Sequence, residues 1–315
     1  MSSRVQPSEP VPFLLLGGGY TASRLARRLL ERGARVRITR RTPAGAAATA
    51  AALGPRAEVR VADLTEPASL RDLIEEGAVV VHSAPPASPP TAARGGAIAE
   101  ARLLDLVAAD ETRLVDVLAA AGARRLIYLS STGVYPPAAG GWIDEDVPPA
   151  PAGALGRRRL AAEEALLAAA ARAGLSAAAL RAAAIYGPGR GVHVRIAAGT
   201  YQVLGDGSGY VSRIQVDDLG SAILAAADAT SLARPAYNVA DDEPTRAREH
   251  ADAVARMLDL PPPPSLPADK ASPEARDLLG GDRRISNRRL REELGVELAF
   301  PTWREGLAHA LAHPN

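Results

Sequence analysis

The residues whose spacing most strongly suggests a chemical role are Gly17, Gly19 and Ala22. They follow an apolar run at residues 13–16, typical of a buried parallel strand, and a helical pattern begins at once after them. In this dinucleotide-binding fingerprint the first glycine allows a tight turn, the second admits a pyrophosphate, and the small third residue packs helix on strand. Backbone N–H groups at the helix start, including those of Tyr20 and Thr21, would face the phosphates. A flexible turn is the alternative, but the flanking strand and helix favour a cofactor site.

The second predicted strand, at residues 35–39, leads directly into Arg40 and Arg41. A carboxylate near this strand end would accept hydrogen bonds from the ribose 2′-hydroxyl of NAD, whereas guanidinium groups can pair with the 2′-phosphate of NADP. We therefore expect NADP in preference to NAD. The alternative is that one or both arginines are solvated loop charges.

These residues require elements that position them, and the chain alternates strand and helix patterns throughout its first part. Further strands are predicted at 57–62, 79–84, 125–130 and 175–181, with long helices at about 98–121 and 155–172. Repeated alternation of this kind predicts right-handed crossovers and an α/β fold with a doubly wound parallel sheet. Ligands of such sheets bind beyond the carboxyl ends of the strands, so the residues after each strand are candidate site residues.

Two of those strand ends carry candidate cofactor contacts. Asp63 and Leu64 follow the third strand, and the Asp63 carboxylate could accept a hydrogen bond from an adenine amino group; the alternative is that it only caps the next turn. Ser83, Ala84 and Pro85 end the fourth strand, where their backbone could line the ribose and diphosphate. His82, just before them, is expected to be a buried histidine with a hydrogen-bond partner.

The composition of the 315-residue chain excludes several other classes of function. The net charge of +1 gives no electrostatic signature of nucleic-acid or anionic-membrane binding. The absence of cysteine excludes thiol catalysis and thiolate metal sites, and no His/Asp/Glu cluster has metal-ligand spacing. No apolar run reaches the roughly 18 residues of a membrane span, and no secretory signal is visible. We therefore expect a cytoplasmic protein that binds a small molecule.

Several later segments together resemble the extended short-chain dehydrogenase/reductases, the NAD(P)-dependent epimerase/dehydratase superfamily. These segments are Ser-Ser-Thr-Gly-Val-Tyr at 130–135, Leu-Arg-Ala-Ala-Ala-Ile-Tyr-Gly-Pro-Gly-Arg at 180–190, Ser-Arg-Ile-Gln-Val-Asp-Asp-Leu at 212–219, Tyr-Asn-Val-Ala-Asp-Asp-Glu-Pro at 237–244, and the stretches 285–295 and 300–307. Their order along nearly the whole chain is more specific than any one of them.

The resemblance implies a Rossmann domain and a small C-terminal lobe that binds substrate. After a flexible leader at residues 1–12, residues 13–185 and a returning segment at 215–240 would form the cofactor domain. The lobe would comprise residues 186–214 and 241–315. The implied chemistry is hydride transfer at a carbon that bears oxygen, and the long helices imply a homodimer interface.

In this family a serine polarises the substrate oxygen and a tyrosine transfers its proton, assisted by a lysine four residues after the tyrosine. Ser131 matches the family serine. The expected Tyr-x-x-x-Lys falls on Leu155 and Arg159, and leucine cannot carry a proton. Arg159 can supply positive charge and hydrogen bonds to the ribose, but it cannot titrate usefully.

Three explanations of the missing tyrosine remain open. Tyr135, Tyr186 or Tyr210 could substitute for it, although tyrosine usually has a structural role at the family positions that Tyr135 and Tyr186 match. Tyr135 is counted among the candidate catalytic residues, and Tyr186 is also expected to line the cofactor pocket. Alternatively, substrate or water supplies the proton and the enzyme acts by positioning alone. In the third case hydride transfer is lost. The bound NADP is then structural or regulatory, as in a sensor, or the cleft catalyses a non-redox reaction.

Near the substrate, the resemblance implies Ser131, Thr132, His193 and Arg213. The Arg213 guanidinium could bind an anionic group, with an ion pair to Asp217 or Asp218 as the alternative. For His193, a solvated loop position is the favoured interpretation and a place facing the cleft is the other one. The leading hypothesis is an NADP-dependent oxidoreductase or epimerase with an altered proton relay, and the alternative is an NADP-binding protein without redox turnover.

Overall fold

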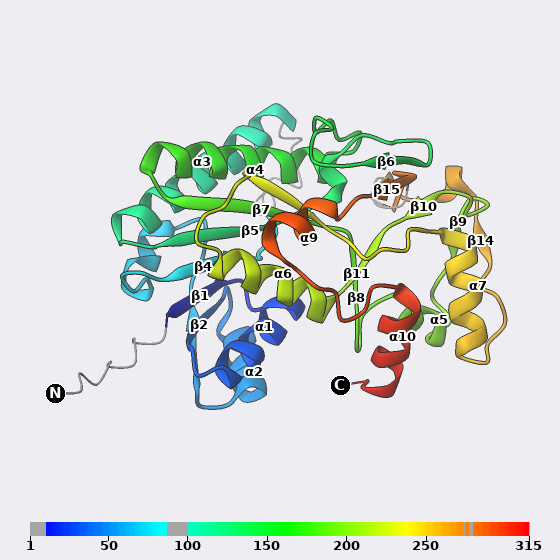
Figure 1. The fold of residues 1–315 in the computed structure, drawn as a ribbon, viewed down its shortest axis with the longest axis horizontal. Helices are drawn as coiled ribbons and strands as arrows, with labels where there is room; N and C mark the ends of the chain where they lie inside the picture. Colours follow the sequence, from blue (N-terminus) through cyan, green and yellow to red (C-terminus); the bar gives the residue numbers. More distant parts are fainter. Residues whose placement is uncertain (1–10, 87–99, 274, 277–279, 315) are drawn as a thin grey trace.

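The computed structural model describes residues 11–86, 100–273, 275–276 and 280–314 (Figure 1). Within these residues, seven strands form one sheet in which every neighbouring pair is parallel. The strands are β1 (Pro12–Leu16), β2 (Arg35–Arg40), β3 (Ala57–Val61), β4 (Val79–His82), β5 (Arg125–Ser131), β7 (Ser176–Ala182) and β12 (Ala236–Val239). The predicted doubly wound parallel sheet is confirmed.

The order of the strands defines where a ligand of this sheet should bind. The order across the sheet is β12-β7-β5-β4-β1-β2-β3. From β1 the chain runs outward through β2 and β3, then returns to β4 on the other side of β1 and continues outward to β12. The carboxyl ends of β1 and β4 therefore form the topological switch point, where open α/β sheets bind ligands.

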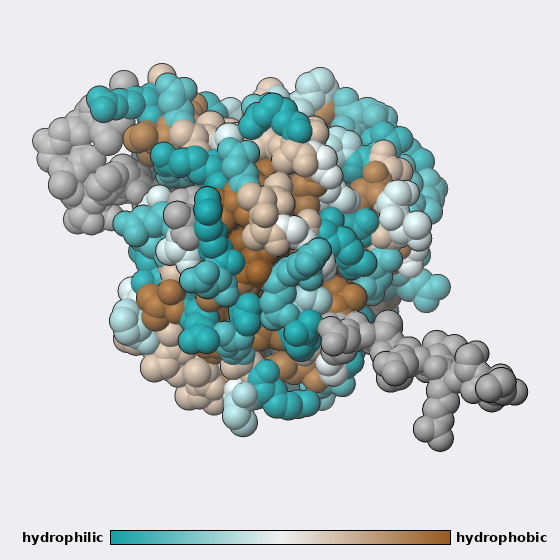
Figure 2. Space-filling model, turned by 90° about the vertical axis from the view of Figure 1, so that its left-hand side faces the viewer, coloured by the Kyte–Doolittle hydropathy of each residue, from teal (hydrophilic) through white to brown (hydrophobic). Residues whose placement is uncertain are grey.

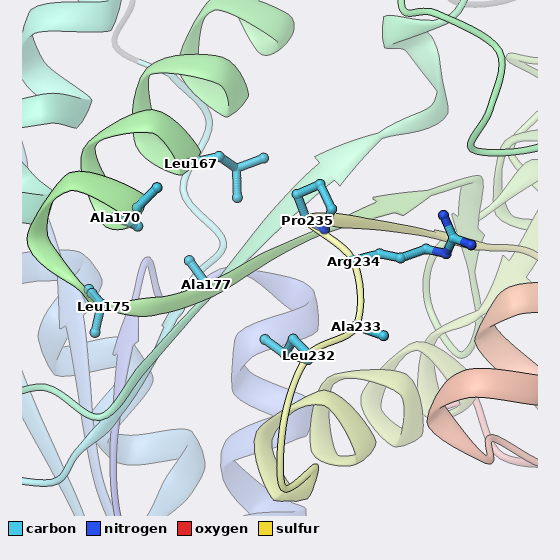
Figure 3. A pocket seen from close by; sticks show the side chains of 9 residues that line it. Leu167, Ala170, Leu175, Ala177, Leu232, Ala233, Arg234 and Pro235 are labelled. Carbon is cyan, nitrogen blue, oxygen red and sulfur yellow. The ribbon is translucent and has the colours of Figure 1, made fainter.

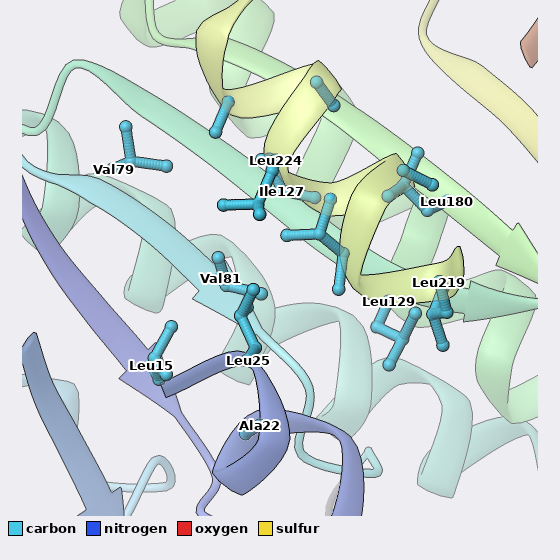
Figure 4. Close-up of a cluster of buried hydrophobic side chains, with 14 of the residues drawn as sticks. Leu15, Ala22, Leu25, Val79, Val81, Ile127, Leu129, Leu180, Leu219 and Leu224 are labelled. Atoms are coloured by element: carbon cyan, nitrogen blue, oxygen red, sulfur yellow. The ribbon is translucent and has the colours of Figure 1, made fainter. Parts of the chain in front are cut away.

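Both faces of the sheet are buried, as the unbroken apolar run of β1 predicts. Phe13 and Leu15 face the side covered by α1 (Tyr20–Glu31) and α6 (Val216–Asp228), and Figure 4 shows the aliphatic side chains packed there. Leu14 and Leu16 face the opposite side, covered by α3 (Glu100–Ala120) and α4 (Ala154–Ala173). The two apolar layers hold the sheet edge rigid beneath the candidate site.

Most predicted elements of the cofactor domain are present, with small differences at their ends. The strand predicted at 79–84 ends at His82, because the N–H groups of Ser83 and Ala84 both donate to the carbonyl of Leu16 and turn the chain over β1. β1 begins at Pro12, inside the predicted leader, of which residues 1–10 lie outside the described part. Residues 98 and 99 of the predicted long helix also lie outside it.

The remaining short elements lie mainly in the C-terminal half, beside the main sheet (Figure 1). Their strands pair as β8 (Ala184–Tyr186) with β11 (Arg213–Gln215), β6 (Gly141–Ile143) with β15 (Arg283–Ile285), β9 (Val203–Leu204) with β14 (Ser265–Leu266), and β10 (Tyr210–Val211) with β13 (Thr245–Arg246). The helices are α2 (Pro43–Leu53), α5 (Val192–Ala197), α7 (Ala247–Met257), α9 (Arg288–Leu294), α10 (Trp303–Ala312) and the 3-10 turns η1 (Pro67–Leu73), η3 (Thr132–Val134) and η4 (Ala268–Lys270). Among the helices described, none is long and apolar enough to cross a membrane.

Candidate cofactor and active site

The glycine turn has the geometry that its sequence predicts. Gly17 has a φ of +95°, in the region that favours glycine, and a Cβ there would lie 3.0 Å from the backbone nitrogen of Ala84. A Cβ on Gly19 would meet no atom of the described residues within 4 Å, so these residues leave open space in front of it. Gly19 is the N-cap of α1, no side chain caps the helix, and its first turn holds no acidic residue. The helix start thus offers unpaired N–H groups and a positive dipole end to a phosphate.

Neighbouring strand ends hold this turn in place. The Ser83 hydroxyl donates to the Gly17 carbonyl at 2.9 Å, and the Gly17 N–H donates to Thr39 Oγ1 at 3.1 Å. The Gly18 N–H donates to the Thr39 carbonyl at 2.8 Å. The structure therefore brings the predicted residues after β1 and β4 together at the switch point.

Arg40 lies directly against the glycine turn. Its guanidinium donates to the Gly18 carbonyl, and a Cβ on Gly18 would lie 2.6 Å from Arg40 Cδ. The neighbouring Arg41 is exposed, and Thr42 caps α2 by accepting from the Gly45 N–H at 3.2 Å. Two cations and a helix start thus occupy the end of β2, where a family member specific for NAD would carry an acid.

At the end of β3, Asp63 caps the turn that follows, which is the alternative to a contact with adenine. Asp63 Oδ1 accepts from the Thr65 N–H at 3.0 Å and from the Thr65 hydroxyl at 2.9 Å, so this oxygen caps the turn. Leu64 follows it, half-buried against the core of the α3/α4 face. Contact of Asp63 with an adenine remains a prediction that only its second carboxylate oxygen could fulfil.

Of the two serines at the end of β5, only Ser131 is available to a ligand. Ser130 is buried, and its hydroxyl donates to Glu163 Oε2 at 2.5 Å. Ser131 is half-buried, accepts from the Gly133 N–H at 3.1 Å, and is followed by the half-buried Thr132 at the start of η3. Its hydroxyl hydrogen has no protein acceptor among the described residues and can point toward a bound oxygen.

The start of α4 lies against this serine turn, where the family tyrosine would stand. A Cβ on Gly156 would lie 2.5 Å from the Gly133 carbonyl oxygen, so helix and turn are in close contact. Leu155, the residue before Gly156, is 40% exposed. The Arg159 guanidinium reaches back to β5, donating to the Tyr128 hydroxyl at 3.2 Å and the Leu129 carbonyl at 3.1 Å. Leu155 and the fixed Arg159 cation thus occupy the two positions, four residues apart, where the family tyrosine and lysine are expected.

The geometry disfavours Tyr135 as the substitute proton donor. Its side chain is buried, and its hydroxyl accepts from Arg181 Nη1 at 2.8 Å and donates to Asn238 Oδ1 at 2.9 Å. Burial raises the pKa of Tyr135, with Arg181 opposing that shift. Both hydrogen-bonding directions of the hydroxyl are used inside the protein, so a catalytic role for Tyr135 has no support in this geometry.

The two other tyrosines lie farther along the chain in different surroundings. The Tyr186 hydroxyl is buried without a hydrogen-bond partner among the described residues, and a Cβ on Gly306 of α10 would overlap it. Burial raises the pKa of Tyr186, and the Asp241 carboxyl adds to the shift. The Tyr210 ring is stacked by Arg246 and Arg284, at 4.6 and 4.9 Å from its centroid. Proton transfer by either tyrosine stays a prediction.

Arg213 is a buried cation inside the C-terminal half. Its Nη1 donates to the Val211 carbonyl at 2.8 Å, and burial lowers its pKa to about 10 while the Asp241 charge opposes the shift. The predicted alternative, an ion pair with Asp217 or Asp218, is not formed. Asp217 instead lies 3.9 Å from Arg24 Nη1, and Asp218 accepts from the N–H groups of Ala299 and Phe300. The expected electrostatic partner was therefore wrong.

One of the two histidines considered in the sequence differs from expectation. His193 is buried in α5, and burial lowers its pKa, so the solvated-loop interpretation was wrong. His82 is buried with Nε2 3.1 Å from Glu111 Oε2, as predicted for a histidine with a partner. The residues that the structure describes contain no group of three or more acidic or histidine side chains that could hold a metal.

A shallow hollow lies at the other end of the sheet (Figure 3). Leu167, Ala170, Leu175 and Ala177 line one side of it, and Leu232 and Pro235 the other, near the amino ends of β7 and β12. Figure 2 views this side of the molecule and shows brown apolar patches among hydrophilic side chains. Because ligands of doubly wound sheets bind at carboxyl ends, this hollow is not the candidate site.

Known proteins share this arrangement. Residues 13–240 match the model of the NAD dependent epimerase/dehydratase family. The chain belongs to this family. It is 36% identical over 213 residues to the "3-diazoavenalumate denitrifying reductase" of a Streptomyces species, covering 62% of this chain and 67% of the relative.

Two solved structures extend the similarity over the whole fold. A functionally unknown protein from Silicibacter pomeroyi is 34% identical with a TM-score of 0.74, covering 96% of this chain and 98% of that one. MoeE5, solved with UDP-glucuronic acid and NAD, is 25% identical with a TM-score of 0.76 over the same shares of the two chains. Family membership and a relative named as a reductase support an enzyme that uses a nicotinamide cofactor.

Sequence reasoning missed several residues that shape the site. Arg24 and Arg190 lie at the start of α1, and Glu163 and Arg181 form a buried ion pair at 2.5 Å beneath Ser130. Arg190 ends a segment that was singled out, but no local pattern shows that it lies beside residue 20. Glu163 could have been recognised as a charged residue on the apolar side of a helix. The helix is so rich in alanine that its apolar side is hard to define from sequence.

Proposed function

We propose that the chain is an NADP-dependent reductase of a small organic molecule. The observation that carries this proposal is the open glycine turn with Arg40 packed on it and no acid at the end of β2. The residues fit the cofactor, because the described residues leave the space in front of Gly19 open for a pyrophosphate, and none of their side chains caps the helix start behind it. When bound, the nicotinamide supplies the hydride.

The chain's own residues would bind and orient the cofactor and polarise the substrate. The glycine turn and the start of α1 would hold the diphosphate, and Arg40 with Arg41 the 2′-phosphate. Arg159 would hold the ribose, fixed by its bonds to Tyr128 and Leu129. The Ser131 hydroxyl would donate to the substrate atom that gains electron density.

We infer that the proton comes from water or from the substrate rather than from a tyrosine. Leu155 occupies the family tyrosine's place in the sequence, and the Tyr135 hydroxyl is enclosed. A reductase fits this arrangement better than an epimerase, which must remove and return a proton or hydride reversibly at one carbon. The name of the Streptomyces relative, a reductase of a diazo compound, also favours reduction.

We further propose that residues 186–214 and 241–315 form the substrate lobe, with Thr132 beside the reacting atoms. Arg213 and His193 would lie at the far end of the substrate, and the Arg213 guanidinium favours an anionic substrate.

A homodimer through α3 and α4 is part of this proposal. It would cover Leu106, which is 44% exposed on α3. A cytoplasmic location is also proposed.

Substitution of Ser131 tests the assigned chemistry. We expect Ser131→Ala to lower the rate of substrate-dependent NADPH oxidation, followed by nicotinamide absorbance, by about 10²- to 10³-fold, as for loss of an oxyanion donor. The Kd for NADPH should stay within about twofold. Ser69→Ala, at an exposed serine of η1, is the matched control and should leave both quantities unchanged.

The same assay distinguishes a reductase from the second candidate function, an NADP-binding protein without redox turnover. If Ser131→Ala turns over as fast as the wild type, the role of Ser131 is wrong. Wild-type protein that binds NADPH but shows no substrate-dependent oxidation across carbonyl, diazo and sugar-nucleotide compounds would instead favour an NADP-binding protein without redox turnover. The loss of the family tyrosine at Leu155 is the observation that keeps this alternative.

A further inference from the structure

Tyr20 connects the glycine turn to a turn that lies far away in the sequence. It is the first residue of α1, and its hydroxyl donates to the Pro188 carbonyl at 2.9 Å. Gly187 packs on the same hydroxyl: a Cβ there would lie 2.7 Å from Tyr20 Oη. The backbones of Gly187 and Arg190 exchange two hydrogen bonds, at 2.9 and 3.0 Å, which close residues 187–190 into a tight turn. This turn is therefore fixed against the start of α1.

Two guanidinium groups flank the Tyr20 ring. Arg24 Cζ lies 5.2 Å and Arg190 Cζ 5.4 Å from its centroid, both within the range of cation–π attraction. Arg24 is occupied, since it reaches the Pro188 carbonyl at 3.5 Å and Asp217 at 3.9 Å. Arg190 is exposed, and among the described residues its guanidinium has neither a hydrogen-bond acceptor nor a carboxylate within 4 Å.

This arrangement concentrates positive charge at one end of α1. The helix dipole is positive there, the first turn has no acid, and Asp217, which lies near Arg24, is shared with the Gln215 side chain at 3.0 Å. Like charges held together are unfavourable unless an anion binds between them. The open space in front of Gly19 lies at this same helix end.

We propose that Arg190 binds the diphosphate of the dinucleotide from the side opposite the glycine turn. The inference rests on the cofactor site of the proposed function and adds a residue from the segment that begins the C-terminal half. The Tyr20 ring would support the Arg190 guanidinium, and the Tyr20 hydroxyl would hold the turn at Pro188, so that the diphosphate is in reach of both the start of α1 and Arg190. Cofactor binding would thereby be coupled to the placement of the segment that leads into α5.

The test compares the full-length wild type with Arg190→Ala, using three probes: NADPH, ADP-ribose, which has the diphosphate but no 2′-phosphate, and 2′-AMP, which has the 2′-phosphate but no diphosphate. We expect Arg190→Ala to raise the Kd for NADPH and for ADP-ribose about tenfold, as for loss of one charge-assisted contact. The Kd for 2′-AMP should stay within about twofold, because that phosphate would bind at Arg40 and Arg41.

The control is Arg195→Ala, which removes another exposed arginine that stacks on a tyrosine, at 5.1 Å from the Tyr201 ring. It should leave all three affinities unchanged. Unchanged NADPH and ADP-ribose affinities in Arg190→Ala would overturn the assignment of Arg190 alone, as would an equal weakening of all three probes. Wild-type protein that binds none of the probes would overturn the proposed function itself.

Discussion

At the scale of single residues, the absence of the family tyrosine leaves the proposed reduction without the usual proton donor. Within the described part of the chain no group accepts the Ser131 hydroxyl hydrogen at the end of β5, whereas the Tyr135 hydroxyl is hydrogen-bonded to Arg181 and Asn238. A hydroxyl that both accepts and donates within a buried network cannot reach a substrate without breaking that network. In the proposed mechanism the chain thus keeps a group that would polarise a substrate, while Tyr135 is not placed to protonate it.

Substitution of Tyr135 separates a structural from a catalytic hydroxyl. We expect Tyr135→Phe to lower the free energy of unfolding by about 1–3 kcal/mol, because the Arg181 donor and Asn238 acceptor lose their partner in a buried site. Turnover should stay within a few-fold of the wild type when both are assayed well below their melting temperatures. Urea unfolding and NADPH oxidation are the two measurements. A hundredfold loss of turnover with unchanged stability would mean that Tyr135 transfers the proton.

The site residues that could be predicted are those whose role is indicated by the residues next to them in the sequence. Gly17, Gly19 and Arg40 lie next to a strand and a helix whose patterns are visible, and the structure places them together. The enclosure of Tyr135 could not be predicted, because Arg181 and Asn238 lie 46 and 103 residues away. The burial of His193 was missed for the same reason.

At the scale of elements, long apolar periodic segments were predicted well and short ones were not. The strands of the main sheet and the helices α3 and α4 follow from apolar runs and helical spacing. The two-residue strands β9, β10, β13 and β14 carry no pattern of their own, since each exists only through a partner 34 or more residues away. The end of β4 at His82 likewise depends on the Leu16 carbonyl of a neighbouring strand.

The α7 helix buries a histidine that should make stability depend on pH. His250 lies against the Trp303 ring, 4.6 Å between centroids, and its Nδ1 is buried without a partner among the described residues. Burial lowers the pKa of His250 well below its usual value, and the charges of Arg213 and Arg304 add to the shift. The folded protein therefore keeps this ring neutral at pH values where the unfolded chain protonates it. Stability contributed in this way is present above the unfolded pKa and is lost as the pH falls below it.

We expect the contribution of His250 to the free energy of unfolding to decrease from about pH 6.5 downward, by at most about 1.4 kcal/mol per pH unit. His250→Gln should flatten that slope in urea unfolding between pH 7.5 and 5.5, leaving the part that His193 contributes with the same sign. His313→Gln, at an exposed histidine after α10, is the control and should keep the wild-type slope. A slope unchanged by His250→Gln would contradict this account.

At the scale of the whole molecule, the sheet order explains why distant segments meet at one site. Reversal of strand order between β1 and β4 brings the glycine turn, Arg40 and Ser83 to one edge, and Ser131 stands at the neighbouring carboxyl end of β5. The turn at 187–190 lies against the same edge through Tyr20. The substrate is left undefined by sequence, because the segments that would contact it carry the fewest regular patterns.

The most direct test of the central claim is a fluorescence titration of the wild type and Arg40→Ala with NADPH and with NADH. We expect the wild type to bind NADPH at least about tenfold more tightly than NADH, and Arg40→Ala to lose that preference through a weaker NADPH affinity alone. Arg32→Ala, at the opposite end of α1, is the control and should behave as the wild type. Equal affinity of the wild type for both nucleotides, or binding of neither, would contradict the account of an NADP-dependent enzyme.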